Sequence, residues 1–105
     1  MRVSYVPVAG VLSTDDDTLY TTPGGSTAHV IDFSIINRHT AAVVVQFWVE
    51  PPAGDPVYRV DVTLDAGHTL YPRTNFVLGP TYELHSDCDT ADVVHYYLSI
   101  EEQTL

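Results

Sequence analysis

The histidines are the residues of this chain with the widest chemical range, because an imidazole can bind a metal or exchange a proton near neutral pH. No two of them have the close spacing of a zinc motif such as His-x-x-x-His on a helix. His85 and His95 could face each other across a final hairpin, where two imidazoles would form a metal site or a pH-sensitive element. We favour the interpretation that they are cross-strand neighbours with polar tips at the surface. The five histidines are His29, His39, His68, His85 and His95.

Three adjacent carboxylates, Asp15, Asp16 and Asp17, form a dense acidic cluster. Calcium takes six to eight oxygen ligands, and a loop of carboxylates supplies some of them. The segment lacks the Asp-x-Asp-x-Asp-Gly pattern of a calcium loop, and three adjacent aspartates cannot all point at one ion. We therefore interpret it as a solvated acidic loop and expect no bound metal.

The sequence contains no pattern typical of an enzyme. No serine lies in a Gly-x-Ser-x-Gly nucleophile turn, and no glycine-rich loop precedes a helix that could bind a nucleotide. The sequence does not exclude a pair of catalytic carboxylates such as glycosidases use. However, a chain of 105 residues is small for both a core and a deep cleft. We expect no enzymatic activity, no catalytic residue and no cofactor.

Cys88 is the only cysteine, so no disulfide can form within the chain. Its neighbours Asp87 and Asp89 are expected to raise the pKa of the thiol and to make it a poor nucleophile. We interpret Cys88 as a passive thiol. A disulfide between two chains is the alternative if copies meet at this loop.

The charge of the chain is strongly acidic, with 14 Asp and Glu against 4 Arg and no Lys, and a net charge of -10. A surface of this sign repels phosphate backbones and anionic lipids, so we expect no direct binding of nucleic acid and no membrane binding. The absence of lysine fits either a GC-rich genome or a high-salt environment. We favour the former, because 17% charged residues is a low share for an extreme halophile.

The composition is that of a globular protein, with 45% apolar residues. The longest apolar runs are too short to cross a bilayer. The first five residues, from Met1 to Tyr5, lack the basic-then-apolar pattern of a secretory signal. We expect a soluble protein without a cleaved leader.

The elements that must position these residues are strands, because turn signals recur every 8–12 residues and no window has a sustained helical period. Pro-Gly-Gly at 23–25, the proline-rich segment 51–56 and Gly79-Pro80 interrupt the apolar runs. Pro7 and Gly10 make the first run at best an edge strand or an arm. The strand-like segments are 3–12, 19–22, 28–37, 41–50, 57–64, 69–71, 75–78, 81–85 and 93–101.

The alternation of side chains predicts which residues form the core. The segment 41–50 places Val43, Val45, Phe47 and Val49 on one face, and we expect Trp48 on the opposite face to be covered as well. Similarly, 28–37 places three apolar side chains on one face. The predicted core contains Ile31, Phe33, Ile35, Val45 and Phe47.

These patterns predict an all-β fold: a single antiparallel β-sandwich, jelly-roll or immunoglobulin-like, with about eight strands and little or no helix. We expect residues 1–12 to form an N-terminal arm or edge strand and residues 13–105 to form the sandwich domain.

A longer pattern of turns and strands runs from Leu19 to Glu102. It begins with Leu19-Tyr20-Thr21-Thr22-Pro23-Gly24-Gly25, and two β-branched strands follow, of which the first ends at Asn37. It continues with Leu64-Asp65-Ala66-Gly67-His68 and closes on Ile100-Glu101-Glu102. This pattern resembles that of small β-sandwich virion structural proteins of tailed viruses. The chain departs from it at Thr22 and Gly24, where valine and alanine are more usual, and in lacking a glycine before Glu101.

The resemblance implies a virion structural protein, most of all a capsid decoration or cement subunit on the particle exterior, made in the host cytoplasm. The implied partners are the major capsid protein or other virion proteins, and the implied assembly is a homo-oligomer, a trimer or a pentamer. The alternative is a tail, baseplate or fibre component with a carbohydrate-binding or host-adhesion role, with Trp48 and tyrosines as the platform.

Association would use exposed apolar and aromatic side chains, since tyrosine buries a large area and keeps a polar end. The N-terminal segment could also add as a strand to a neighbouring sheet. The loop 51–56 and the loop around Cys88 are further candidate surfaces. The predicted partner-binding residues are Val3, Tyr5, Val6, Val8, Tyr58 and Tyr97.

Overall fold

The computed structural model describes residues 1–72 and 76–104. Asn75, with which the predicted strand 75–78 begins, lies outside this part of the chain. The described residues form strands and no helix, and none of their segments could span a membrane as a helix. The strands are β1 (Arg2–Val11), β2 (Asp17–Thr21), β3 (Ser26–Asn37), β4 (Val43–Glu50), β5 (Val57–Leu64), β6 (Thr69–Leu70), β7 (Phe76–Leu78), β8 (Glu83–Cys88) and β9 (Val94–Thr104).

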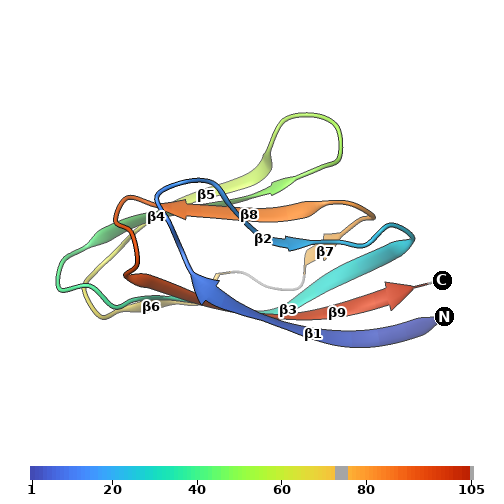
Figure 1. Cartoon of the computed structure of the whole chain (residues 1–105), viewed down its shortest axis with the longest axis horizontal. Helices are drawn as coiled ribbons and strands as arrows, with labels where there is room; N and C mark the ends of the chain where they lie inside the picture. Colours follow the sequence, from blue (N-terminus) through green and yellow to red (C-terminus); the bar gives the residue numbers. More distant parts are fainter. Residues whose placement is uncertain (73–75, 105) are drawn as a thin grey trace.

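The strands form two antiparallel sheets that pack face to face as two layers (Figure 1). Sheet A has the order β1-β9-β3-β6, with β7 also paired to β3, and sheet B has the order β2-β8-β4-β5. The prediction of an antiparallel β-sandwich is confirmed.

The order of the strands identifies the sandwich as a jelly roll. Strands β6 and β7 pair with different ends of β3 and so occupy one strand position. Of the eight positions, only β4 and β5 are neighbours in both sequence and space, and every other connection passes from one sheet to the other. Two four-stranded sheets wound in this way are a jelly roll, not an immunoglobulin fold.

The core lies between the sheets and contains most of the predicted residues. Phe33 of β3 and Phe47 of β4 meet edge to face across it, with ring centroids 5.4 Å apart. Ile35 and Val45 are fully buried beside them. The alternation in the predicted strands therefore located the core correctly at these four positions.

The prediction for Ile31 was wrong, because its side chain is 38% exposed. The pairing of β3 with β9 shifts by one residue here: Val30 pairs with Ile100, whereas Asp32 pairs with Ser99. Ile31 is the extra residue of a β-bulge. The bulge moves the inward positions of β3 from Val30 to Phe33, and Ile31 is left at the surface.

Asn37 connects two neighbouring loops from inside the molecule. Its side chain is fully buried, and Nδ2 lies 2.9 Å from the carbonyl oxygens of both Ala41 and Leu64. Its Oδ1 accepts a hydrogen bond from the backbone N–H of His39 at 2.8 Å. The polar corner after β3 is therefore held to the end of β5.

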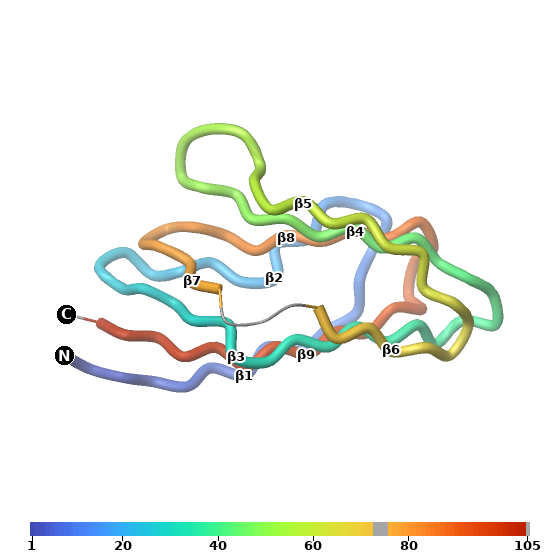
Figure 2. Tube along the Cα trace, turned by 180° about the vertical axis from the view of Figure 1, so that it is seen from behind, coloured from blue at the N-terminus to red at the C-terminus, as the bar shows by residue number. Residues whose placement is uncertain are grey.

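Strand β1 forms one edge of sheet A and pairs with β9 from Arg2 opposite Thr104 to Val11 opposite His95. The two chain ends consequently lie side by side at one end of the sandwich (Figure 2). The connection between β4 and β5 stands out from sheet B, in the layer opposite the two chain ends (Figures 1 and 2).

Candidate functional site

A buried histidine surrounded by carboxylates lies on the outer face of sheet B. His85 belongs to β8, which runs between β2 and β4, so its neighbours come from both sides. Leu84 and Ser86 point into the sandwich, and the alternation therefore places His85 on the outer face. Asp16 approaches from the loop before β2, Glu50 from the end of β4, and Glu83 from the start of β8.

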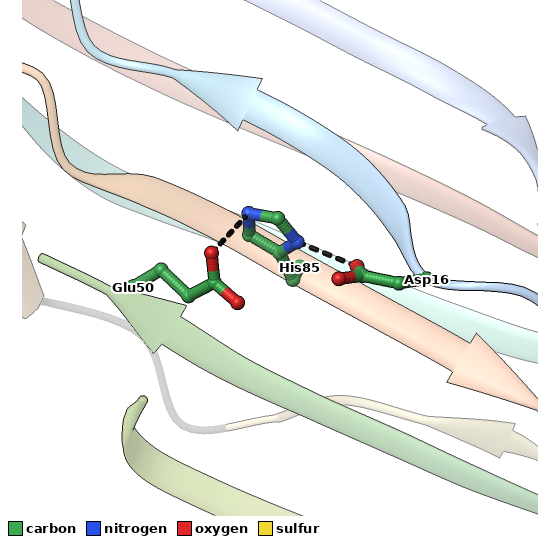
Figure 3. A group of neighbouring side chains, drawn as sticks. All are labelled: Asp16, Glu50 and His85. Atoms are coloured by element: carbon green, nitrogen blue, oxygen red, sulfur yellow. Dashed lines mark hydrogen bonds and ion pairs between the residues drawn. The ribbon is translucent and has the colours of Figure 1, made fainter. Parts of the chain in front are cut away.

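The two ring nitrogens of His85 face different carboxylates. Nδ1 lies 2.5 Å from Oδ1 of Asp16, whereas Nε2 lies 2.9 Å from Oε1 of Glu83 and 3.2 Å from Oε2 of Glu50. Figure 3 shows Asp16 and Glu50 at opposite nitrogens of the ring. The side chain of His85 is 7% exposed. We call these four residues, Asp16, Glu50, Glu83 and His85, the His85 cluster.

Further side chains orient the carboxylates of the His85 cluster. The indole N–H of Trp48 donates a hydrogen bond to Oε1 of Glu50 at 3.1 Å. The hydroxyl of Thr21 donates one to Oε2 of Glu83 at 3.0 Å. Each of these carboxylates thus has one oxygen held by a neighbour and the other beside the imidazole.

Trp48 is 5% exposed, as the sequence predicted, but it is not part of the core between the sheets. Its ring stacks on His85 of β8 with centroids 5.8 Å apart. From β5, the guanidinium of Arg59 lies 4.9 Å from the ring centroid of Trp48. The indole is therefore covered by polar side chains of its own sheet, on the face opposite the core.

The carboxylates set the protonation of the imidazole. Burial lowers the pKa of His85, but the hydrogen bonds with Asp16 and Glu83 outweigh it and raise the pKa above its ordinary value. The hydrogen bond from His85 is in turn the main cause that lowers the pKa of Glu83. With three carboxylates around one imidazole, the cluster keeps a net negative charge even when the imidazole is protonated.

The predicted pairing of His85 with His95 was wrong. Strands β8 and β9 do not form a hairpin: β8 pairs with β2 and β4 in sheet B, and β9 pairs with β1 and β3 in sheet A. His95 is exposed between Val11 and Ile36 on sheet A. The connection between the last two strands crosses from one sheet to the other and separates the two imidazoles.

The three adjacent aspartates point in different directions. Asp17 accepts hydrogen bonds from the backbone N–H of Ser13 at 2.7 Å and from its hydroxyl at 3.0 Å, which closes the loop between β1 and β2. Asp15 is exposed. Only Asp16 reaches the His85 cluster.

Cys88 ends β8 and is buried. Its Sγ lies 3.1 Å from the carbonyl oxygen of Thr90 and 3.4 Å from that of Ser13. Burial raises the pKa of the thiol, and the nearby charges of Asp89 and Asp87 add to the increase. The environment is that of a passive thiol.

The predicted partner-binding residues differ in exposure and in position. Val3, Tyr5 and Tyr97 are exposed on the outer face of sheet A, whereas Val6 and Val8 point inward and pack against the core. Tyr58, at the start of β5, has a positive φ of 53°. Its ring packs in a T-shaped arrangement with the rings of Phe47 and Phe76, and its side chain is 40% exposed.

The outer face of sheet A carries a broad set of exposed apolar side chains. Cross-strand pairing places Tyr5 beside Glu101 and Tyr97 beside Ala9, with Tyr5 itself 69% exposed. We call this surface the apolar face. Its large exposed apolar residues are Val3, Tyr5, Val11, Ile31, Val77 and Tyr97.

The sequence interpretation missed Glu50, Glu83 and the role of Trp48. One signal was available: Glu83 and His85 are two residues apart in a strand and must share a face. The approach of Glu50 follows from its pairing opposite Glu83, and this register depends on the whole sheet.

The chain is similar to known proteins in its structure but not in its sequence. No protein-family model matches the sequence, and no curated protein matches it. A chain of the structure described as the acidic stable capsid of Helicobacter pylori bacteriophage KHP30 is similar, with a TM-score of 0.58 at 13% identity over 95% of this chain and 86% of that one. A chain of the Bacillus endospore appendages, described as disulfide-linked pili, has a TM-score of 0.57 at 13% identity over 99% and 88%. At this identity the similarity shows a shared fold.

Proposed function

We propose that this protein is a virion structural subunit that decorates or cements a viral capsid through protein–protein contacts. The observation that carries the proposal is the apolar face, where six large apolar side chains are exposed on one sheet. An exposed apolar surface of this kind is typical of an interaction site. The resemblance of the sequence to virion proteins of tailed viruses supports the viral context, and so does the similarity in fold to a phage capsid chain.

The two outer faces differ in chemistry, and this difference gives the subunit an orientation. The apolar face has Glu101 and Asp32 as its carboxylates among many apolar and hydroxyl groups. The outer face of sheet B carries the carboxylates of the His85 cluster together with Asp61 and Asp87. We place the apolar face against the particle and sheet B toward solvent, where its negative charge would keep coated particles dispersed.

The edge strand offers a second mode of contact. Strand β1 pairs with β9 along one side, and no other strand of the described residues pairs with its second side. A strand from a neighbouring chain could add there, although Pro7 removes one backbone donor. Such additions in a ring would give a homo-oligomer, for which we propose a trimer or a pentamer that matches a capsid symmetry axis.

The fold also fits other assemblies, since the pilus chain of the Bacillus appendages shares it. Those pili are described as disulfide-linked, whereas the single cysteine of this chain is buried. We therefore favour non-covalent association on a capsid over a pilus of that kind.

The alternative function is a tail, baseplate or fibre component that binds carbohydrate. Jelly rolls occur in lectins as well as in capsids. Trp48 does not suit the platform, because His85 and Arg59 cover its ring. A sugar would have to stack on exposed tyrosines such as Tyr5 and Tyr97, and a glycan array tests this directly.

Binding to particles tests the capsid proposal. We would measure co-sedimentation of the protein with capsids of the virus that encodes it, and its oligomeric state by light scattering. A Tyr5→Ala, Tyr97→Ala double variant should bind at least about 30-fold more weakly, as expected for interface hot spots. Tyr71→Ala is the matched control, since this exposed tyrosine lies beyond β6, at the other edge of sheet A.

Two outcomes of these experiments would contradict the proposal. A monomer without affinity for any particle component would overturn the proposed function. A double variant that binds as the wild type does would overturn the assignment of the apolar face.

A further inference from the structure

We propose that the His85 cluster is a binding site for Zn²⁺, in which Nε2 of His85 and one oxygen each of Glu50 and Glu83 bind the ion. This site is independent of the function proposed above, because it lies on the outer face of the other sheet.

The ligand atoms are already gathered at one ring nitrogen. Nε2 lies 2.9 Å from Oε1 of Glu83 and 3.2 Å from Oε2 of Glu50. Tetrahedral zinc with bonds of about 2.0–2.1 Å needs ligand atoms about 3.3 Å apart. If an ion replaced the proton that Nε2 shares with the two carboxylates, the two nitrogen–oxygen distances would have to change by only a few tenths of an ångström.

Asp16 has a different part in the site. Asp16 contacts Nδ1, on the other side of the ring. An ion bound to Nε2 and Glu83 would therefore be out of its reach. A histidine that binds zinc commonly donates its other N–H to a carboxylate, which fixes the tautomer and strengthens the ligand. The 2.5 Å contact between Asp16 and His85 is an arrangement of this kind.

The carboxylate ligands are oriented in the same way. Trp48 donates to the oxygen of Glu50 that does not face the imidazole, and Thr21 donates to the corresponding oxygen of Glu83. Each proposed ligand thus has an outer partner that holds it in place, which is a regular feature of metal sites in proteins.

The surroundings favour an ion on the imidazole over a solvated acidic patch. The side chain of His85 is 7% exposed, stacked against Trp48, and held on one face of the sheet. Glu50 and Glu83 are about one third exposed, which leaves an approach from solvent and room for a water ligand. A ring nitrogen of His85 and one oxygen each of Asp16 and Glu50 lie within 4.8 Å of one another, so Asp16 is close to the ligands as well.

One imidazole with two carboxylates suits zinc better than the alternatives. Calcium and magnesium prefer six or more oxygen ligands, and the cluster supplies a nitrogen and few oxygens. Imidazole together with carboxylate is a common zinc set, with three protein ligands and one open position.

Titration of Zn²⁺ into the chelator-treated full chain tests the site by calorimetry at constant pH. We expect one ion per chain and a melting temperature that rises with Zn²⁺ concentration. His85→Gln and Glu83→Gln should remove this binding. Asp16→Asn should weaken it about 10- to 100-fold without removing it. His95→Gln, which changes an exposed histidine on sheet A, is the matched control and should bind as the wild type does.

Circular dichroism of each variant shows whether it folds. Glu83 is partly exposed, so Glu83→Gln should fold even if His85→Gln does not. Absence of Zn²⁺ binding by the folded wild type at millimolar concentration would overturn the proposal and leave His85 as an imidazolium paired with carboxylates. Unchanged binding by Glu83→Gln together with loss in Asp16→Asn would overturn the assignment of Nε2.

Discussion

The hydroxyl of Tyr20 on β2 donates a hydrogen bond to the carboxylate of Glu102 on β9, so a polar contact joins the two sheets of the sandwich. Tyr20 belongs to the Leu-Tyr-Thr segment with which the long sequence pattern begins, and Glu102 belongs to its end. The two ends of the pattern therefore meet in space. This contact gives a physical reason for a tyrosine and a glutamate at these positions.

Tyr20→Phe should destabilise the protein at neutral pH by about 1–3 kcal/mol, because the half-buried carboxylate of Glu102 loses its donor. Burial, followed by the hydrogen bond and the charge of Glu102, raises the pKa of Tyr20 far above its ordinary value of 10. The folded state therefore keeps the phenol neutral while the unfolded state ionises it. The stabilisation is complete below pH 10 and is lost as the pH rises above 10 toward the folded pKa.

Urea unfolding of both proteins at pH 7 and pH 11 measures this effect. The difference in free energy of unfolding between wild type and Tyr20→Phe should shrink at pH 11. A constant difference would mean that the phenol does not titrate as the contact with Glu102 requires.

Asn37→Ala should destabilise the protein by about 1–3 kcal/mol for each buried group that it leaves without a partner. The carbonyl oxygen of Leu64 loses the buried donor Nδ2, and the N–H of His39 loses its acceptor. Thr40→Ala, at an exposed position of the same corner, is the control. Equal unfolding midpoints in urea for the two variants would contradict the structural role of Asn37.

The strands and most of the core could be predicted because alternation is a local property. In β5, Val60, Val62 and Leu64 point inward while Arg59 and Asp61 point outward, as their spacing requires. The bulge in β3 could not be predicted in this way. Val30, Ile31 and Phe33 are all apolar, so the pattern does not reveal at which of them the register shifts.

The candidate site was less predictable because its residues come from separate strands. Sequence reasoning assumed that the last two strands form a hairpin and so paired His85 with His95. In a jelly roll the final connection crosses between the sheets, and β8 lies beside β4 instead. The contacts of His85 with Glu50 and Trp48 depend on that long-range pairing, which no local pattern encodes.

A pair of substitutions tests the bulge in β3. Phe33→Ala removes a fully buried aromatic ring and should cost about 3–5 kcal/mol. Ile31→Ala changes the outward extra residue and should cost less than about 1 kcal/mol. Chemical denaturation of both variants decides the matter, since a regular strand without a bulge would bury Ile31 and make the two costs similar.

The thiol of Cys88 should be protected from reaction in the folded protein. Burial raises its pKa, the charges of Asp89 and Asp87 add to this, and Sγ lies against the carbonyl oxygens of Thr90 and Ser13. Both the low thiolate fraction and the lack of access slow attack on a disulfide reagent. We expect reaction with Ellman's reagent at least about 100-fold slower in buffer than in denaturing urea, because the thiol reacts only after local opening.

The same experiment decides whether copies of the chain can be linked through Cys88. Non-reducing electrophoresis of protein kept under mild oxidation should show monomers, and Cys88→Ala should leave the oligomeric state unchanged. Rapid reaction of the native thiol, or a disulfide-linked dimer that Cys88→Ala removes, would show that the end of β8 opens far more readily than its burial implies. In that case the proposed association of subunits would include a covalent route in addition to the edge of β1.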